Sequence, residues 1–240
     1  MSPSLAVVCF LWHDPKSKWR DVFWYGPEHV VVLRNMAARH LTIPHRFVCV
    51  TDRPELLPAD IETVPLDTSL ITPSERYAKL MIWRPDAAEL FGAERILAFD
   101  LDVVITGNID HLVEHDHPVA LWANPRFPQQ PIRRSRYNTS LVYLRAGARP
   151  DVWEQFDIHT SPDAVRATGV CGTDQGWVSM VLGDTAHGFG CEAGIYSFRI
   201  HVQRLGRLPQ DARLVSFHGN ISPHLRTIQE AHPWVRKHYR

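Results

Sequence analysis

The first part of the chain alternates short apolar segments with one segment of helical spacing. Leu5–Leu11 is continuously apolar, as a strand covered on both faces of a sheet should be. Residues 30–41 carry apolar side chains at the spacing of one helix face, and residues 45–51 and, more weakly, 61–66 have the composition of strands. This order predicts the beginning of a nucleotide-binding α/β sheet, whose ligands bind beyond the carboxyl ends of the strands.

The apolar segment over residues 95–105 contains two aspartates separated by one residue. Asp100 and Asp102 follow a run of apolar residues and precede three β-branched residues. A buried carboxylate without a partner costs several kcal/mol, so two of them at the end of a buried strand need a compensating cation. Both can reach one hard metal ion if the chain bends there, and Mg²⁺ or Mn²⁺, which take oxygen ligands, fit best. The alternative is a strand end with two solvated acids, one of which caps the next turn.

Polar residues also stand where later strands and helices begin or end. They are Asn138 at the start of a strand over 137–144, Asp174 and Gln175 just before a helix over 177–182, and His218 and Gly219 after a strand over 213–217. Each has a structural alternative, because Asn favours turns and Thr173 or Asp174 can simply cap the helix. A histidine can likewise close the end of a strand.

Two further segments bear on the candidate site. A helix predicted over 76–84 places its apolar side chains on one face and leaves Lys79 on another. Residues 124–136 are rich in Pro, Gln and Arg and lack periodicity, so they form a long loop. Loops of that length in compact domains commonly cover or bind a ligand.

Composition limits the classes of function. The chain has 240 residues, 45% of them apolar, which is enough for one large α/β domain and short for two. Lys plus Arg and Asp plus Glu number 26 each, so the formal net charge is zero. This balance argues against a dedicated nucleic-acid binder and against bulk attraction to anionic membranes. The chain has neither a G-x-G-x-x-G motif nor a Walker lysine loop, which argues against a typical dinucleotide fold and a P-loop NTPase.

The cysteines and the N-terminal residues indicate a compartment. The four cysteines contain no C-x-x-C pair, so a zinc ribbon or a thioredoxin motif is not expected. The N-terminal apolar run lacks a basic region in front of it and resembles a first strand more than a signal peptide. No window approaches 18 uncharged apolar residues, so no transmembrane helix is expected. These features predict a cytoplasmic protein with reduced thiols.

Taken in order, the polar segments resemble a known family. A helix with Lys79-Leu80 precedes Asp100-Leu101-Asp102, and the segments at Asn138, Asp174-Gln175 and Phe217-His218-Gly219 follow. This order is similar to that of GT-A-fold glycosyltransferases of the glycogenin and glycosyltransferase family 8 type, and of related bacterial and phage proteins with an Asp-x-Asp motif. The resemblance covers roughly residues 5–224, and its most specific parts are 99–104 and 108–110. It implies one GT-A, Rossmann-like domain with a central mixed, mostly parallel sheet flanked by helices.

The resemblance also implies roles for individual residues. Asp100, Asp102 and His218 match the metal ligands, and Lys79, Asp100, Asn138 and Gly219 match residues that hold the nucleotide-sugar donor. Asp174 and Gln175 match positions at the sugar and the reacting face and are the candidate catalytic residues. The loop after the first strand, residues 11–14, lies where the base and ribose would bind.

The chain departs from the family pattern at one position. The family often places a lysine after the histidine, where it contacts the diphosphate, and Ser222 stands at that position here. Another cation could make the contact, the diphosphate could be held more weakly, or the protein could lack full transferase activity. The candidate cations are Lys79, Arg226 and the arginines of the 126–136 loop, among them Arg133, Arg134 and Arg136.

The sequence therefore predicts a metal-dependent enzyme that moves a sugar from a nucleotide-diphosphate donor, most simply a UDP-sugar, with Mn²⁺ or Mg²⁺ as the metal. The resemblance implies retention of anomeric configuration. The acceptor is open: a glycan, a lipid-linked saccharide, a protein or a small molecule, with nucleic acid not indicated by the net charge. The single domain would comprise a nucleotide-binding half of about residues 1–107, an acceptor and sugar half of about 108–225, and a C-terminal arm over 226–240.

Two alternatives belong to other classes of function. Nucleotide-sugar hydrolases and nucleotidyltransferases also place paired carboxylates and Mg²⁺ at a sheet edge. A nucleotidyltransferase normally has a glycine-rich loop after the first strand, and residues 11–18 contain no glycine. The other alternative is a catalytically weak module that binds a nucleotide sugar, suggested by Ser222.

Overall fold

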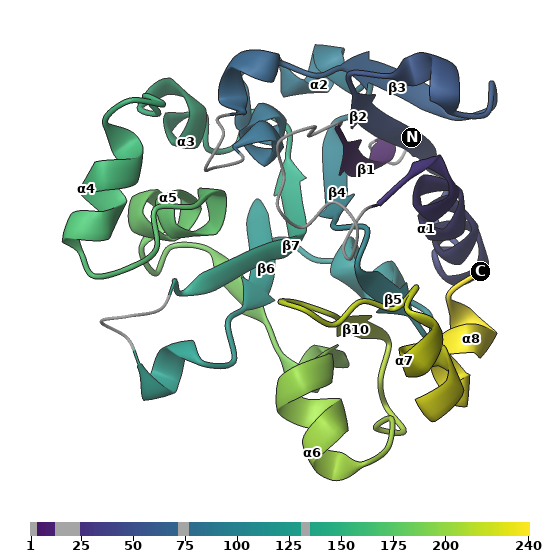
Figure 1. The fold of residues 1–240 in the computed structure, drawn as a ribbon. Helices are drawn as coiled ribbons and strands as arrows, with labels where there is room; N and C mark the ends of the chain where they lie inside the picture. The colour runs from purple at the N-terminus through teal and green to yellow at the C-terminus, as the bar shows by residue number, and fades with distance from the viewer. Residues whose placement is uncertain (1–3, 13–24, 72–76, 131–134) are drawn as a thin grey trace.

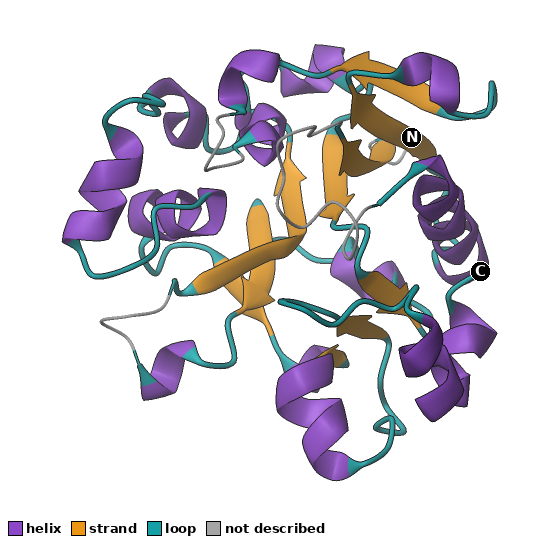
Figure 2. Cartoon of the chain, viewed as in Figure 1, coloured by secondary structure: helices purple, strands orange, loops and turns teal. Residues whose placement is uncertain are grey.

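A seven-stranded sheet runs through the centre of the molecule (Figure 1, Figure 2). The computed structural model describes residues 4–12, 25–71, 77–130 and 135–240. The strands are β1 (Leu5–Leu11), β2 (Arg46–Thr51), β3 (Glu62–Pro65), β4 (Arg95–Phe99), β6 (Val119–Ala123), β7 (Tyr137–Arg145) and β8 (His187–Phe189). They lie in the order β3-β2-β1-β4-β7-β6-β8, and only the β4–β7 and β6–β7 pairs are antiparallel. The predicted mixed, mostly parallel sheet is confirmed.

A small second sheet contains residues 103–105, which the sequence predicted only to continue extended after the aspartates. The chain leaves the large sheet after Phe99, turns at Leu101 and Asp102, and enters β5 (Val103–Ile105). This strand pairs with β10 (Leu214–Ser216), which pairs in turn with β9 (Ile195–Ser197). A turn is the physical solution here, because it places two carboxylates outside the sheet while the apolar residues on both sides stay buried.

The helices flank the sheets (Figure 2). The α-helices are α1 (Pro27–His40), α2 (Ala87–Leu90), α3 (Asp151–Glu154), α4 (Ser161–Ala167), α5 (Asp174–Leu182), α6 (Gln203–Leu205), α7 (Arg226–Ala231) and α8 (Pro233–His238). Short 3₁₀ turns are η1 (Pro54–Leu56), η2 (Thr68–Leu70), η3 (Ala78–Trp83), η4 (Asp110–Leu112), η5 (Phe127–Gln129) and η6 (Cys191–Ala193), and η7 (Phe198–Val202) is a π-helix. The helix predicted over 76–84 is the 3₁₀ segment η3, in which every residue except Lys79 is buried. The sequence pattern did not predict β8 or α4.

The core has two apolar layers, one on each face of the large sheet. Along β1, alternate residues such as Val7 and Cys9 face α1, α8 and the small sheet. The residues between them, such as Val8, face η3 and the helices α2 to α5. A strand covered in this way is buried on both faces, which explains the continuous apolar run of Leu5–Leu11. No helix in the described ranges is long and apolar enough to cross a membrane.

The C-terminal arm packs against the beginning of the chain. In Figure 1 the yellow helix α8 lies beside the purple helix α1. Arg39 on α1 donates hydrogen bonds to the backbone oxygens of His238 and Arg240, both at 2.7 Å. The arm is therefore tied to the helix that covers one face of the sheet. The proposed division of the domain at residue 107 stays a prediction.

The strand that ends at the aspartates should dominate stability. Leu97 of β4 is fully buried, so Leu97→Ala removes apolar contacts and leaves a cavity. We expect a loss of about 2–5 kcal/mol of unfolding free energy in urea denaturation. The matched control is Leu56→Ala on η1, where the side chain is half exposed and the loss should stay within about 0.5 kcal/mol. Equal losses in the two variants would contradict the buried position of β4.

Candidate functional site

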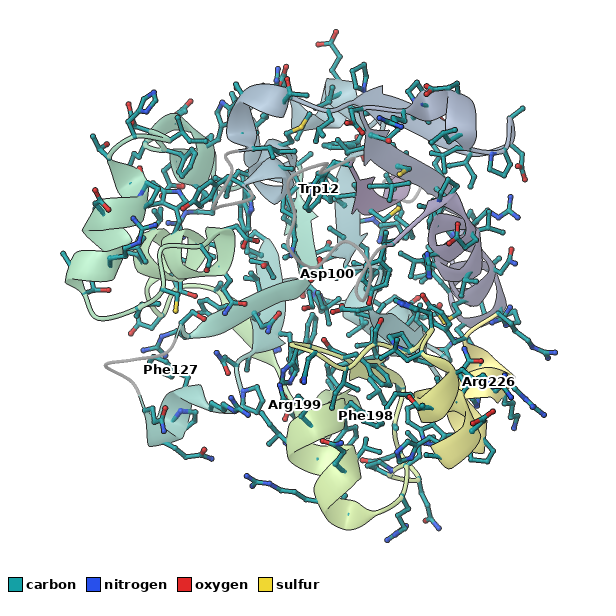
Figure 3. All side chains as sticks on the ribbon, viewed as in Figure 1. Trp12, Asp100, Phe127, Phe198, Arg199 and Arg226 are labelled. Carbon is teal, nitrogen blue, oxygen red and sulfur yellow. The ribbon has the colours of Figure 1, made fainter. Side chains whose placement is uncertain are left out.

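The turn after β4 is held on both sides by backbone hydrogen bonds. The amide of Asp100 donates to the carbonyl of Ser140 on β7 at 3.1 Å, and the amide of Phe217 donates to the carbonyl of Asp102 at 3.0 Å. Because β7 runs antiparallel to β4, the beginning of β7 lies beside the end of β4. Asp100 lies near the middle of the molecule, as does Trp12 at the end of β1 (Figure 3). The two aspartates are thus placed at the carboxyl end of the central strands, where α/β sheets bind ligands.

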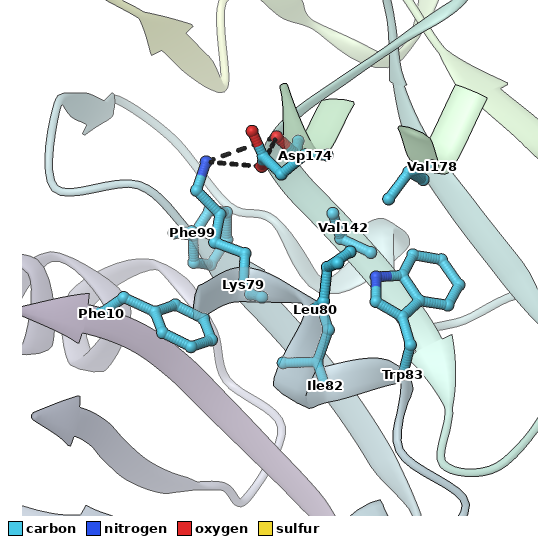
Figure 4. Close-up of a pocket in the computed structure, with 11 residues that line it drawn as sticks. Phe10, Lys79, Leu80, Ile82, Trp83, Phe99, Val142, Asp174 and Val178 are labelled. Atoms are coloured by element: carbon cyan, nitrogen blue, oxygen red, sulfur yellow. Dashed lines mark hydrogen bonds and ion pairs between the residues drawn. The ribbon is translucent and has the colours of Figure 1, made fainter. Parts of the chain in front are cut away.

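Lys79 is the centre of a charge cluster beside this turn, and Figure 4 shows a dashed line between its ammonium and the carboxylate of Asp174. Its Nζ lies 2.7 Å from Oδ1 of Asp100 and 3.6 Å from Oδ2 of Asp174. Thr139 completes the cluster, because its Oγ1 lies 3.3 Å from Nζ and donates a hydrogen bond to Oδ2 of Asp174 at 2.7 Å. Burial alone would lower the pKa of Lys79, but the charges of Asp100 and Asp174 outweigh it and raise that pKa. Lys79 therefore carries its positive charge at neutral pH.

Apolar side chains form the floor beneath this cluster. Phe10, Leu80, Trp83 and Phe99 line a cavity of about 10 Å³ under Lys79 (Figure 4), room for about one water molecule. A floor of this kind lowers the local dielectric, so the ion pairs above it are stronger than those on an open surface.

Asp102 has no such partner. Its Oδ1 atom is buried and has no hydrogen-bond partner among the described residues. Burial, together with the charge of Asp100, raises the pKa of Asp102 well above its ordinary value. The hydroxyl of Tyr239 donates to the carbonyl of Leu101 at 3.2 Å, so the C-terminal arm reaches the residue between the two aspartates. A buried, unpartnered carboxylate oxygen next to a second carboxylate is the arrangement expected at a cation site.

His218 follows Phe217 directly and therefore lies close to the backbone of Asp102. Its Nε2 lies 2.7 Å from Oγ of the buried Ser197. Burial, and then the charges of Arg126 and Arg199, lower the pKa of His218 to about 4. The imidazole is neutral at neutral pH, which is the form that binds metals. Within the described part of the chain, no three Asp, Glu, His or Cys side chains converge closely enough to hold a metal ion, since His218 is turned toward Ser197.

A cleft with a volume of about 200 Å³ extends from His218 along the start of β7 and of α5. Asn138 and Gln175 both line it. Oδ1 of Asn138 accepts a hydrogen bond from the amide of Ser140 at 2.8 Å, and Nε2 of Gln175 donates to Oγ of Ser135 at 3.0 Å. The full lining is Trp122, Asn124, Pro125, Arg126, Ser135, Asn138, Val170, Cys171, Thr173, Gln175, Ile200 and His218.

The helix that carries Asp174 and Gln175 begins as its sequence predicts. Thr173 caps α5, and its hydroxyl accepts a hydrogen bond from the amide of Gly176 at 3.3 Å. With Thr173 as the cap, the carboxylate of Asp174 is not needed for capping and points to Lys79 and Thr139 instead. The sequence left open whether Asp174 was only a cap, and the structure assigns that role to Thr173.

Ser222 is fully engaged inside the protein. It is buried, and its hydroxyl contacts the hydroxyl of Tyr25 and Nδ1 of His224, the latter at 2.9 Å. Of the candidate cations for its position, Arg226 pairs with Glu230 on the surface of α7. Lys79 pairs with the carboxylates described above. Four residues of these predictions lie outside the described residues: the candidate cations Arg133 and Arg134, and His13 and Asp14 of the loop predicted to bind the base.

The structure thus gathers the predicted residues in two adjoining groups. Lys79, Asp100, Asp102 and Asp174 meet at the turn after β4, while Asn138, Gln175 and His218 line the cleft, with Gly219 next to His218. Sequence reasoning missed Thr139 and Ser197, which bond to Asp174 and His218. Thr139 directly follows Asn138, which was a predicted site residue, so the signal was close by. The sequence around Ser197 contains no pattern that predicts a functional residue.

The fold is GT-A, the fold of nucleotide-sugar glycosyltransferases. A structure of the galactosyltransferase LgtC with donor and acceptor sugar analogs has a TM-score of 0.59 and 13% identity, over 98% of this chain and 96% of that one. The apo-form glycosyltransferase GlyE of Streptococcus pneumoniae has a TM-score of 0.60 and 12% identity, and its match covers 97% of this chain but 60% of GlyE. An active-site Gln-to-Glu mutant of LgtC has a TM-score of 0.58 and 12% identity, over 98% of this chain and 96% of that one.

These likenesses establish the fold and confirm the predicted resemblance to GT-A glycosyltransferases. No protein-family model matches the sequence. No curated protein is significantly similar to it in sequence.

Removing the ammonium from the charge cluster should destabilise the protein. Lys79→Met leaves the carboxylates of Asp100 and Asp174 without a counter-charge. We expect a loss of about 2 kcal/mol at neutral pH, less than a fully buried pair, because each side chain keeps some exposure. Urea denaturation of the variant and the unaltered protein measures this loss of unfolding free energy.

The matched control is Arg84→Met, which breaks the more exposed pair with Asp86 and should cost less than about 1 kcal/mol. An equal loss in the two variants would show that Lys79 is not the neutralising group of the cluster.

Proposed function

We propose that the protein is a metal-dependent glycosyltransferase, which transfers a sugar from a nucleotide-diphosphate donor to an acceptor hydroxyl. The observation that carries this proposal is the buried, unpartnered Oδ1 of Asp102, beside Asp100 at the carboxyl end of β4 in a GT-A fold. The carboxylates of Asp100 and Asp174 pair with the ammonium of Lys79, and the charge of Asp102 also acts on it. These three carboxylates outnumber the one ammonium, and a divalent cation would supply the missing positive charge.

The side chains at this turn suit Mn²⁺ or Mg²⁺. Asp100 and Asp102 would supply carboxylate oxygens, and neutral His218 would supply an imidazole nitrogen after turning from Ser197. The mixture of oxygen and nitrogen ligands favours Mn²⁺ over Mg²⁺. A cation held there would neutralise the negative charge that develops on the departing diphosphate. The backbone hydrogen bonds on both sides of the turn hold the two aspartates in place for it.

The cleft beside the turn suits the donor sugar. Asn138 and Gln175 present amide groups to it, and sugar hydroxyls both donate and accept hydrogen bonds. Asp174 directly precedes Gln175 and contacts Thr139 and Lys79, which supports the proposal that its carboxylate lies nearest the reacting face. The LgtC mutant structure shows that an active-site glutamine exists in that protein, and Gln175 is the glutamine among the described residues that lines this cleft.

We propose that transfer retains the configuration of the sugar. The acceptor oxygen forms a bond to the anomeric carbon on the face from which the diphosphate leaves, and the acceptor proton passes to the leaving diphosphate oxygen. Such a route needs no strong general base in the protein. Lys79 pairs with Asp100 and Asp174 beside it. The donor is proposed to be a UDP-sugar.

The acceptor is proposed to carry a sugar hydroxyl. The LgtC structure supports this proposal, because it contains donor and acceptor sugar analogs and its chain matches over nearly its whole length. A glycan or a lipid-linked saccharide fits this class directly. A protein or a small molecule that presents a hydroxyl stays within the same chemistry, because the reaction needs only a nucleophilic oxygen.

The test is turnover with a panel of nucleotide sugars, Mn²⁺ and a panel of saccharide acceptors. We expect release of nucleoside diphosphate together with a glycosylated acceptor, lost when a chelator removes the metal. Asp102→Asn should reduce the rate by at least about 100-fold, because it removes charge stabilisation of the leaving group. Asp184→Asn, which changes an exposed aspartate beyond α5, should leave the rate unchanged.

Other products would identify the alternatives. Free sugar with nucleoside diphosphate, or sugar phosphate with nucleoside monophosphate, would indicate a hydrolase. Sugar phosphate with nucleoside triphosphate, formed when pyrophosphate is added, would indicate a nucleotidyltransferase. Tight binding of a nucleotide sugar without turnover over the whole panel would contradict the proposal and support a binding module.

A further inference from the structure

Two guanidinium groups stand at the His218 end of the cleft. Arg126 lines the cleft directly. Arg199 lies against Gly219, so closely that a Cβ on that glycine would collide with its Nη1. Both are near enough to His218 for their charges to act on its imidazole. Two guanidinium groups thus lie close to His218 and next to the cleft.

Neither guanidinium group has an anionic partner in the described parts of the chain. Elsewhere arginines of this protein pair with nearby carboxylates, as Arg84 does with Asp86 and Arg149 with Asp151. Arg126 and Arg199 are both partly buried, yet each makes neither an ion pair nor a side-chain hydrogen bond there. Partial burial of an unpaired cation is unfavourable, so an anion at this position would stabilise the protein.

The local backbone is built to present Arg199. It lies in the π-helix η7, a conformation that is rare and often found at functional sites. Ser197 begins this helix, and its hydroxyl accepts a hydrogen bond from the amide of Ile200 at 3.1 Å while contacting His218. The segment that carries Arg199 is therefore fixed to His218, a candidate metal ligand. Arg199 and the neighbouring Phe198 are labelled in Figure 3.

We propose that Arg199, with Arg126, forms the anion site that binds the two phosphate groups of a nucleoside diphosphate. The inference rests on the proposed function and names the protein groups that hold the donor's diphosphate and its product. A guanidinium group offers paired N–H donors whose geometry matches two phosphate oxygens. Arg199 then stabilises the diphosphate as the bond to the sugar breaks.

This assignment also accounts for Ser222. Ser222 is buried, and its hydroxyl already contacts Tyr25 and His224, so it is not needed to bind the diphosphate. Arg136, another arginine near the cleft, stacks its guanidinium over the ring of Phe127 at 4.7 Å and is engaged there. Among the arginines around the described cleft, Arg126 and Arg199 are left with their charge available.

The test measures binding of inorganic pyrophosphate and of UDP to the full chain with Mg²⁺, by calorimetry. Pyrophosphate makes the result independent of the base. Arg199→Gln should weaken both ligands about 10- to 100-fold, the effect of losing hydrogen bonds between charged groups. Arg126→Gln should weaken both as well. Arg199→Lys, which keeps the charge without the paired donors, should fall between Arg199→Gln and the unaltered protein.

Arg204→Gln is the matched control, because Arg204 is exposed on α6 five residues further along and does not line the cleft. Its affinities should equal those of the unaltered protein. If the unaltered protein binds both ligands and Arg199→Gln binds them as tightly as Arg204→Gln, the inference is wrong while the proposed function stands.

If the unaltered protein binds neither pyrophosphate nor UDP, the proposed function fails and the inference with it. Thermal unfolding separates binding from folding. If Arg199→Gln and Arg199→Lys lose the same affinity and both unfold at a much lower temperature than Arg204→Gln, Arg199 is a structural residue and the inference is overturned.

Discussion

The site depends on an imbalance of charge around Lys79. One ammonium group neutralises Asp100 and Asp174, and Thr139 fixes the second of these carboxylates, but Asp102 is left buried beside them without a partner. Such an arrangement is unfavourable, because burial without a partner raises the pKa of a carboxyl group and destabilises the folded state. Under the proposed function, a divalent cation at this turn would supply the missing positive charge.

The topology explains how residues far apart in sequence reach one place. The antiparallel pairing of β7 with β4 brings Thr139 next to Asp100, and the small sheet brings Phe217 to Asp102. Backbone hydrogen bonds fix both positions, from the amide of Asp100 to Ser140 and from the amide of Phe217 to Asp102. The positions therefore do not depend on flexible side chains. The carboxylates therefore lie together at the turn after β4, while Arg126 and Arg199 lie near His218.

The sequence predicted the sheet and the aspartate turn well, because the signals there are local. A continuously apolar strand is expected to be covered on both faces of its sheet. Two acids directly after such a strand predict that the chain leaves the core there, because buried carboxylates without partners are costly. The pattern could not show that 103–105 belongs to a second sheet, since β5 pairs with a strand more than 100 residues later. It also could not show that Lys79 pairs with Asp100 and Asp174, because that contact depends on three-dimensional packing.

Other features had no local signal at all. Arg199 lies in a π-helix that neither helical nor strand periodicity describes, and Ser197 caps the start of that helix. Tyr239 reaches Leu101 across 138 positions of sequence. By contrast, the cap at Thr173 follows from a side chain and an amide three residues away, so it was within reach of the sequence.

The most direct test of the account is the position of Mn²⁺ in a crystal of the protein grown with Mn²⁺ and UDP, located by anomalous scattering. The account predicts Mn²⁺ bound by Asp100 and Asp102, with His218 turned from Ser197 toward the ion. Absence of Mn²⁺ from this turn, with Oδ1 of Asp102 still unpartnered and His218 still bound to Ser197, would contradict it.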